Sequence, residues 1–260
     1  MKYSVAQASR IGGRKSNQDR VGYVHSGNAL LMVVADGMGG HQRGEVAAEL
    51  TVQVFTKAFE NQAAKGFPDP HAFLSKSASD AHLAIMDYAQ QHEMKEPPGT
   101  TCVACMTLDG VAYWMHAGDS RLYHFRNSKL LQKTRDHSLV EKMVEQGTLA
   151  PEDTAKHPSK NIIYNCLGAV GVPRIDLSEK TPLQAGDTLL LCSDGLWGPL
   201  TDREIAVGSN GDTPEACMTQ LMNLAEKRAG RSSDNLSAIL VQYSSENSVE
   251  RTHPSGLSSK

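Results

Sequence analysis

Four short segments that contain aspartate are the residues of this sequence with the clearest potential for chemistry. They are residues 17–19 (Asn-Gln-Asp), 36–40 (Asp-Gly-Met-Gly-Gly), 193–195 (Ser-Asp-Gly) and 233–235 (Ser-Asp-Asn). Each adjoins an apolar run that is typical of a buried strand, so folding would gather the carboxylates at strand ends. Aspartates gathered at the edge of a low-dielectric core repel one another unless a cation neutralises them. The pattern therefore indicates a site for divalent cations.

Oxygen ligands decide which metals such a site would select. Mg²⁺ and Mn²⁺ accept carboxylates, backbone carbonyls and waters, so thiolate and imidazole ligands are not required. Gly37 directly follows Asp36, where a residue without a side chain would let the backbone turn sharply and bring a carbonyl close to an ion.

Composition limits the class of protein. A chain of 260 residues with 40% hydrophobic residues can form one large domain or two small ones, and we favour one. The formal charge of -3 and the absence of a Lys/Arg cluster argue against nucleic-acid binding. The first residues lack a secretory signal, and the longest apolar run, 29–35, is too short to span a bilayer. We expect a cytoplasmic protein without membrane contacts.

The five cysteines are expected to be reduced, because the number is odd and no export signal precedes them. Cys102 and Cys105 form a CxxC pair inside an expected strand. Residues three apart in a strand point to opposite faces, so this pair should not form a metal or redox site.

Six segments rich in apolar and β-branched residues, bounded by Gly, Asp or Ser, are predicted strands. They are 30–35, 101–108, 111–117, 121–125, 187–192 and 236–243. Asp109-Gly110 is a strong tight-turn signal, so 101–117 should form an antiparallel hairpin.

Helices are predicted between these strands. The segment 44–62 has apolar residues at helical spacing, whereas 69–91 and 213–229 each open with a capping side chain followed by proline. Shorter helices are predicted at 138–146 and after the capping box that starts at Thr201. Hairpins with two long helices inserted together predict an α+β sandwich rather than a βαβ alternation.

Two segments differ from the rest. Residues 136–174 mix Pro, Gly, His and Lys around a short helix and are interpreted as a surface insertion. Residues 244–260 offer little to bury and are predicted to be a disordered tail.

Seven motifs, in order along the chain, resemble those of the metal-dependent PP2C-type (PPM) protein serine/threonine phosphatases. They are Arg14-x4-Asp19, 36–41 (Asp-Gly-Met-Gly-Gly-His), 99–101 (Gly-Thr-Thr), 117–121 (Ala-Gly-Asp-Ser-Arg), 136–138 (Asp-His-Ser), 193–197 (Ser-Asp-Gly-Leu-Trp) and 234–238 (Asp-Asn-Leu-Ser-Ala). The chain is most similar to the small bacterial members, which consist of the catalytic domain alone. This resemblance implies a β-sandwich of two antiparallel sheets flanked by α-helices, spanning residues 1–243, with a flap at about 136–174 beside the active site.

The resemblance also implies ligands for two Mg²⁺ or Mn²⁺ ions. Asp36 would bridge the two ions, the carbonyl of Gly37 would complete one coordination sphere, and Asp194 and Asp234 would hold the other ion. Asp119 matches a position that helps to bind a third, weaker ion in bacterial relatives.

Three more residues acquire roles from the resemblance. Arg14 matches the arginine that holds the substrate phosphate, Asp19 would orient a metal-bound water, and Asn235 would support the ligands without touching metal. The chemistry is consistent, because two ions about 3.5–4 Å apart can activate a water and neutralise a phosphoryl group, and arginine offers phosphate a planar fork.

The sequence departs from the family pattern at two positions. Gln18 stands where many members have glutamate, which removes one water-mediated carboxylate contact. Met38 stands where eukaryotic relatives have a histidine thought to protonate the leaving group, so that role falls to water or to His41.

These residues predict a hydrolase of phosphoserine and phosphothreonine in proteins, acting as a monomer against a bacterial Ser/Thr kinase. Two alternatives remain: a phosphatase of small phosphorylated metabolites, and a non-catalytic binding module on the same fold. The Cys-x5-Arg loop of cysteine phosphatases and an Asp-x-Asp motif are both absent from the sequence.

Overall fold

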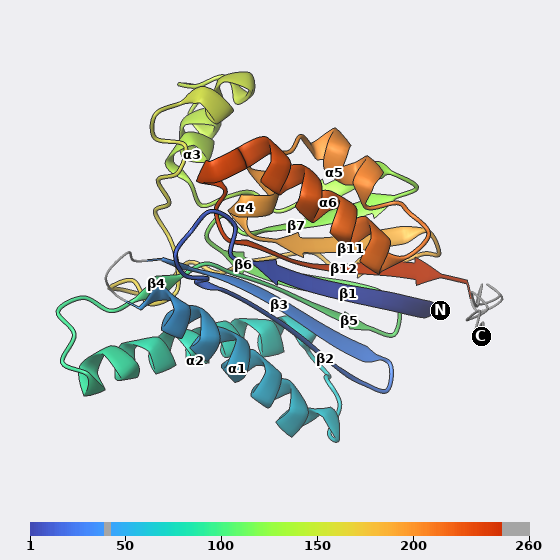
Figure 1. The fold of residues 1–260 in the computed structure, drawn as a ribbon. Helices are drawn as coiled ribbons and strands as arrows, with labels where there is room; N and C mark the ends of the chain where they lie inside the picture. Colours follow the sequence, from blue (N-terminus) through green and yellow to red (C-terminus); the bar gives the residue numbers. More distant parts are fainter. Residues whose placement is uncertain (39–42, 246–260) are drawn as a thin grey trace, which may run out of the picture.

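The strands of this computed structural model, which describes residues 1–38 and 43–245, form two antiparallel sheets (Figure 1). The first sheet has the order β1 (Lys2–Arg10), β12 (Leu236–Ser244), β11 (Asp187–Cys192), β7 (Arg121–Arg126) and β8 (Lys129–Lys133). The second has the order β10 (Thr181–Pro182), β6 (Val111–Ala117), β5 (Cys102–Leu108), β3 (Ala29–Met38) and β2 (Asp19–Ser26), with β4 (Gly99–Thr100) beside β3 and β9 (Asp176–Leu177) beside β6.

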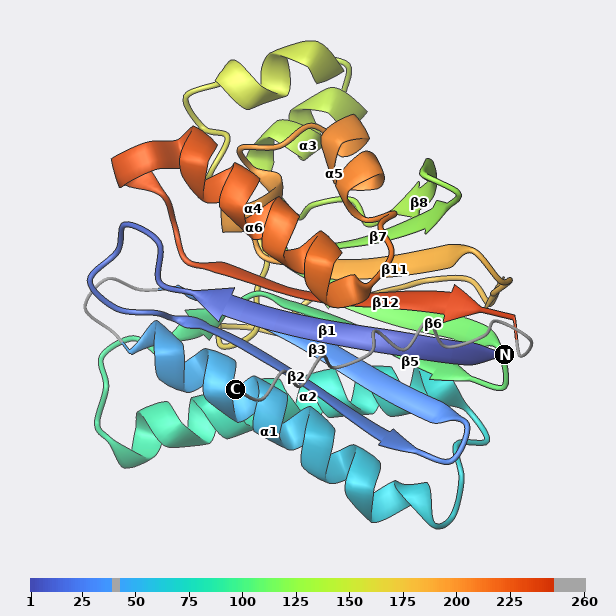
Figure 2. The same cartoon turned by 45° about the vertical axis from the view of Figure 1, so that its right-hand side comes forward.

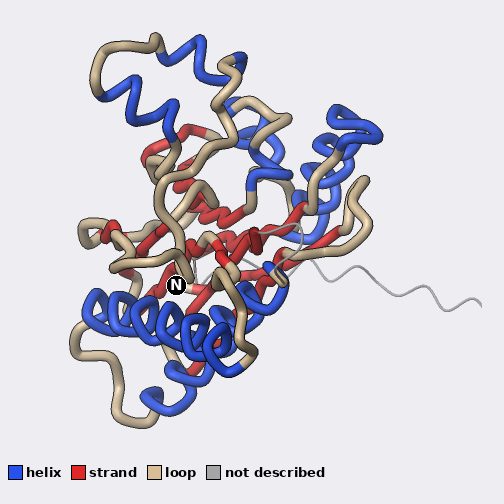
Figure 3. The backbone as a smooth tube through the Cα atoms, turned by 90° about the vertical axis from the view of Figure 1, so that its left-hand side faces the viewer, coloured by secondary structure: helices blue, strands red, loops and turns tan. Residues whose placement is uncertain are grey.

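Helices cover the outer face of each sheet, which gives the four layers visible in Figures 1 and 3. The helices α1 (Gly44–Ala63) and α2 (Pro70–Gln91) pack on the second sheet. The first sheet is covered by α4 (Asp194–Trp197), α5 (Asp202–Gly208) and α6 (Pro214–Ala229), and Figure 2 shows α6 running across β1 and β12. A short 3₁₀ helix, η2 (Gly230–Ser232), follows α6.

The apolar core explains why β3 reads as an uninterrupted hydrophobic run. Its side chains alternate between two buried faces: Leu30 and Met32 pack between the sheets, and Leu31 packs against α1 and α2. A strand buried on both faces needs apolar residues at consecutive positions. A third apolar cluster lies between the first sheet and helices α4 to α6.

The same alternation separates the two cysteines of the CxxC pair. Cys102 belongs to the cluster beside the helices and Cys105 to the cluster between the sheets, and all five cysteines are free. The predicted hairpin is also present: β5 pairs with β6 through Asp109 and Gly110, whose φ values of 49° and 75° are those of a type I′ turn.

The sequence predicted six strands that the structure contains, but it missed the two-residue strands β4, β9 and β10 and the longer strands β1, β2 and β8. The three longer strands are edge strands. Their exposed positions carry polar side chains, as in Lys2–Arg10, so they lack the apolar run that marks a central strand.

The predicted helix starts are confirmed by their capping bonds. The side chains of Asp69, Thr213 and Ser138 each accept a hydrogen bond from a backbone N–H of the following turn. Thr201 and Glu204 form the complete capping box of α5. The helix α1 differs, because the residue before it, Arg43, has a left-handed conformation and no side-chain capping bond.

The predicted flap, residues 136–174, contains α3 (Leu139–Glu145) and the 3₁₀ helix η1 (Pro151–Lys156), and in Figures 1 and 2 it projects from the side of the sandwich that carries α4, α5 and α6. Ser138 and Ile163 form a bridge at its base. Most of the predicted tail, together with His41, lies outside the described residues. Within the described ranges, none of the helices combines the length and the apolar surface that a membrane span requires.

We expect Phe55→Ala to lower the free energy of unfolding by about 3–5 kcal/mol, because the Phe55 ring is fully buried between α1 and the second sheet. Urea unfolding at neutral pH would measure the change. Leu83→Ala serves as the control, since Leu83 is 57% exposed on α2 and its truncation should change stability by no more than about 0.5 kcal/mol. Equal losses in the two variants would contradict this description of the core.

Candidate metal and phosphate site

A cavity of about 550 Å³ opens at one end of the sandwich, and most of the residues predicted to do chemistry line it. Its walls come from the loop before β2, the end of β3, the turn between β6 and β7, the start of α4, the start of β12 and the flap. The lining residues are Gly13, Arg14, Lys15, Ser16, Gln18, Asp36, Gly37, Met38, Thr101, Asp119, Asn161, Ile163, Asp194, Asp234 and Asn235.

Asp36 is positioned by strand pairing. It lies opposite Asp19 in the β2–β3 ladder, so the register of one edge strand places two carboxylates side by side. Its backbone N–H donates to Thr101 Oγ1 at 3.1 Å, and its carbonyl accepts from Thr101 N–H at 2.8 Å. The backbone of Asp36 is therefore fixed on both sides.

Asp19 and Asp194 bring buried oxygens that have no partner. Asp19 is only 1% exposed, and its Oδ2 accepts from Ser193 Oγ at 2.7 Å. The other oxygen, Asp19 Oδ1, is buried without a hydrogen bond, and so is Asp194 Oδ1 at the start of α4. Buried oxygens without donors are unusual in proteins, and each is a potential ligand atom.

Asn235 joins distant parts of the site. Its side-chain Oδ1 accepts from the backbone N–H of Gln18 at 2.9 Å, and its Nδ2 donates to the carbonyls of Ile11 (2.8 Å) and Ser16 (2.9 Å). Its backbone N–H donates to Asp234 Oδ1 at 2.8 Å. One asparagine thus ties the loop that carries Arg14 to the start of β12.

Arg14 projects from this loop toward the aspartates. Its Nη2 lies 2.5 Å from Asp234 Oδ2, while its side chain stays 59% exposed. The ion pair with Asp234 raises the pKa of Arg14. The sequence resemblance predicted that Arg14 holds the substrate phosphate. It did not predict the contact of Arg14 with Asp234.

Gly37 has a packing role that the sequence did not reveal. A Cβ on Gly37 would lie 2.2 Å from the carbonyl oxygen of Gly44 and 2.7 Å from that of Gln18. The first residue of α1 therefore approaches the end of β3 closely enough to require glycine, whatever the Gly37 carbonyl binds.

The electrostatics of the cavity favour a cation. Desolvation, followed by repulsion from Asp19 and Asp194, raises the pKa of Asp36 well above its ordinary value. Desolvation and the neighbouring Asp234 raise the pKa of Asp194 to about 6. Desolvation and Asp194 raise the pKa of Asp119 to about 8. The partnerless oxygens and this mutual repulsion fit a hard divalent cation such as Mg²⁺ or Mn²⁺.

The structure shows what surrounds Gln18 and Met38, the two positions that depart from the family pattern. Gln18 Nε2 donates to Glu45 Oε2 at 3.2 Å, so a carboxylate of α1 lies next to the position where many relatives have glutamate. The sequence did not single out Glu45. Met38 ends β3 and lines the cavity.

A second cluster, formed by His116, His137 and Asp176, lies outside the cavity. Ligand-type atoms of the three residues lie within 4.8 Å of one another. However, His137 Nδ1 accepts from Asn165 Nδ2 at 2.6 Å and from Gly118 N–H at 3.2 Å, which places the ring proton of a neutral histidine on Nε2. A metal-bound histidine instead donates its second ring N–H. His137 is thus a structural residue that joins the Gly118 turn to the flap.

Fold and site together define a metal-dependent phosphate-ester hydrolase: an aspartate cluster at the end of an αββα sandwich, with an arginine at its mouth. The comparison with known families agrees, since the sequence model of the family described as protein phosphatase 2C matches residues 6–241. The chain belongs to the protein phosphatase 2C family, and the family, fold class and enzyme class predicted from the sequence are confirmed.

Several named relatives come from bacteria. The serine/threonine phosphatase stp of Listeria monocytogenes is 34% identical over 233 residues, which cover 88% of this chain and 91% of the relative. The structure of Stp1 from Staphylococcus aureus has a TM-score of 0.85 at 31% identity and covers 94% of this chain and 96% of that one. The catalytic domain of the phosphatase PstP, solved with two manganese ions, has a TM-score of 0.79 at 28% identity and covers 94% and 99%.

With chelator present, we expect stability to fall as the pH rises. The pKa values of Asp36, Asp194 and Asp119 are higher in the folded protein than the ordinary value of 3.8, so the folded state binds more protons than the unfolded state. Their favourable contribution is complete below pH 3.8 and is lost as the pH passes about 6 for Asp194 and about 8 for Asp119.

Urea unfolding in EDTA from about pH 5 to about pH 8.5 would measure this slope. Asp36→Asn removes one repelling charge, so the metal-free variant should be more stable than wild type at the alkaline end and should show a shallower slope. A metal-free wild type that gains stability over this range would contradict the account, as would an Asp36→Asn variant that unfolds more easily.

Proposed function

We propose that this protein hydrolyses phosphoserine and phosphothreonine in other proteins, using two divalent ions held by the aspartate cluster. The observation that carries this proposal is the pair of partnerless buried carboxylate oxygens, Asp194 Oδ1 at the cavity that Arg14 also lines, and Asp19 Oδ1 on the residue paired with Asp36 behind it. Membership of the protein phosphatase 2C family and the names of the bacterial relatives support the same reaction.

Asp36, the carbonyl of Gly37, Asp194 and Asp234 would hold the two ions, and Asp119 would help to hold a weaker third ion. When bound, divalent ions supply a nucleophilic water at neutral pH and neutralise the phosphoryl oxygens. The manganese-bound PstP structure makes Mn²⁺ a reasonable choice, with Mg²⁺ as the alternative. Asp19 is held by Ser193 with one oxygen facing no donor, which suits a residue that orients a metal-bound water.

Arg14 would hold the substrate phosphate. Only its Nη2 is paired with Asp234, so the remaining N–H groups of the exposed guanidinium can donate to phosphate oxygens. Asn235 fixes the loop that carries Arg14 and so limits the freedom of the guanidinium. Met38 carries no proton to donate, and solvent entering the cavity would protonate the leaving serine or threonine oxygen.

The physiological setting follows from this activity. Phosphorylated proteins are the substrates, and a bacterial Ser/Thr kinase would be the opposing enzyme. We further propose that residues 1–243 form one catalytic domain, that the flap at 136–174 borders the substrate, and that the protein acts as a monomer in the cytoplasm.

We expect purified protein to release phosphate from a phosphothreonine peptide in the presence of Mn²⁺, and to lose this activity in chelator and in Asp36→Asn. The variant removes the proposed bridging ligand and reveals any contaminating phosphatase. A panel of small phosphorylated metabolites should be turned over more slowly than the peptide. Absence of turnover by folded, metal-loaded protein would reject the proposed reaction, and faster turnover of a metabolite would replace the substrate class.

Arg14→Ala should lower kcat/KM for the phosphopeptide by about 10- to 100-fold, the range expected for loss of a charge-assisted hydrogen bond. Arg14→Lys should recover part of the loss, because it keeps the charge but not the fork. Arg10→Ala is the matched control, since Arg10 also pairs with an acid, Glu226, but lies outside the cavity. Wild-type kinetics in Arg14→Ala would remove Arg14 from the phosphate site.

A further inference from the structure

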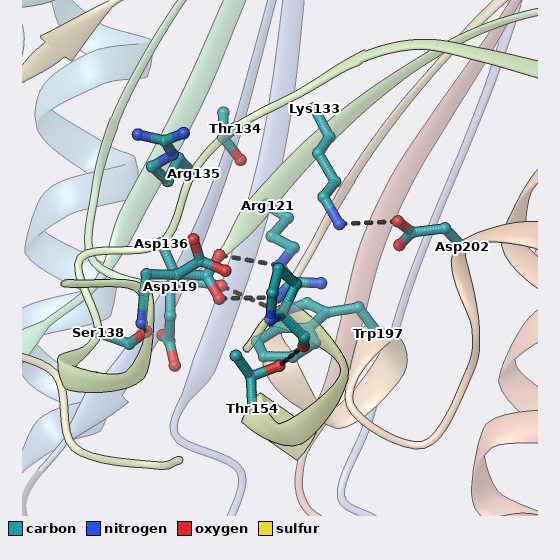
Figure 4. Close-up of polar contacts among 12 residues, drawn as sticks. Asp119, Arg121, Lys133, Thr134, Arg135, Asp136, Ser138, Thr154, Trp197 and Asp202 are labelled. Carbon is teal, nitrogen blue, oxygen red and sulfur yellow. Dashed lines mark hydrogen bonds and ion pairs between the residues drawn. The ribbon is translucent and has the colours of Figure 1, made fainter. Parts of the chain in front are cut away.

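Trp197 connects two of the cavity aspartates. It is the last residue of α4, the short helix that begins with Asp194. Its indole Nε1 donates a hydrogen bond to the backbone carbonyl of Asp119 at 3.0 Å (Figure 4). The helix that carries one carboxylate therefore contacts the backbone of the turn that carries the other.

The Trp197 ring is held from its face by a buried ion pair. The guanidinium carbon of Arg121 lies 3.4 Å from the ring centroid, in cation–π contact. Arg121 is held in turn by Asp136, through Nε to Oδ1 at 2.8 Å and Nη2 to Oδ2 at 2.7 Å (Figure 4). A third bond runs from Arg121 Nη1 to the hydroxyl of Tyr123 at 3.0 Å.

This arrangement is better suited to fixing geometry than to adding stability. The side chains of Arg121 and Asp136 are only 13% and 5% exposed, and desolvation offsets much of the attraction within a buried ion pair. A bidentate pair does, however, fix the plane and position of the guanidinium. The stacked indole is then held with its N–H toward Asp119.

Asp119 depends on such backbone contacts. Its carboxylate accepts no hydrogen bond from another residue that the structure describes, whereas the backbone of its turn is bonded to Trp197 and, at Gly118, to His137. The neighbouring Gly118 exchanges two bonds with His137, through its N–H to Nδ1 and its carbonyl to the His137 N–H.

We propose that Trp197 is a positioning residue that sets the separation of Asp119 and Asp194, and thereby the affinity of the weaker metal position that Asp119 serves. This inference rests on the proposed function, which assigns Asp119 to that position. Trp197 is not among the residues that line the cavity, and it acts through its bond to the Asp119 backbone.

The variant Trp197→Phe tests the proposal, because it keeps an aromatic ring under Arg121 and deletes the N–H. Manganese binding would be followed by the electron paramagnetic resonance signal of free Mn²⁺. We expect two tight ions with unchanged affinity and a weaker ion whose Kd rises about tenfold, the scale of one lost hydrogen bond. Asp119→Ala should lose the weaker ion altogether.

Trp114→Phe is the matched control, since Trp114 is the other tryptophan of the chain and lies between the sheets. It should leave all manganese affinities unchanged.

The same Trp114→Phe variant allows a second experiment, because Trp197 is then its only tryptophan. The fluorescence of the unaltered Trp197 can be followed while Mg²⁺ is added. The emission should change at the concentration that fills the weaker position, and Asp119→Ala in the same background should abolish that change.

The outcomes separate the inference from the function on which it rests. If Trp197→Phe binds the two tight ions, keeps normal phosphatase activity and binds the weaker ion as well as wild type does, the role of Trp197 alone is overturned. Trp197 fluorescence that follows only the tight ions would overturn it too, as would a wild type that binds no third ion. Absence of tight ions and of turnover would reject the proposed function, and the inference with it.

Discussion

Repulsion between converging carboxylates is the constraint on which the rest of this structure depends. Asp19, Asp36, Asp119, Asp194 and Asp234 come from five separate segments; four of them line one cavity, and Asp19 is paired with Asp36 in the adjacent strand. Nothing in their mutual interaction would hold them there, because desolvation and like charge both oppose their ionised forms. Their convergence must be stabilised by the apolar layers behind them, which pack β3, β11 and β12 on both faces. Packing of the core thus offsets this repulsion in the metal-free protein, and a bound cation would relieve the repulsion and stabilise the folded state.

At Asp36 and Asp119, the backbone rather than the carboxylate carries the positioning bonds. Thr101 fixes the main chain of Asp36, Asn235 joins two loops, and Trp197 reaches the main chain of Asp119. This leaves carboxylate oxygens available at the cavity, two of them without any donor. A scaffold built in this way can hold a site in a productive geometry at some cost in stability, which is a common compromise at active sites.

Local sequence predicted those parts of the fold and site that depend on local physics. Central strands such as β3 and β11 are apolar because both faces are buried, and capping residues such as Asp69 mark helix starts by their own bonds. Edge strands carry no such signal, so β1, β2 and β8 were missed.

In the site, the aspartates were predicted from sequence motifs, and the cavity brings Asp36, Asp119, Asp194 and Asp234 together with Arg14. The bond of Trp197 to Asp119, the Arg14–Asp234 pair and the approach of Glu45 to Gln18 join segments far apart in the chain. Such contacts become visible only when the fold places those segments together.

The pairing of β1 with β12 has a consequence for how the protein is made. These strands lie near opposite ends of the chain, and Asn235, at the start of β12, closes the loop that carries Arg14. Contacts of such long sequence separation form late, because the intervening chain must first be ordered. During synthesis on the ribosome, Arg14 would emerge early but would stay unattached until the last strand is available. A nascent chain could therefore fold its second sheet and still lack a working site, which delays enzymatic activity until translation of the domain is finished.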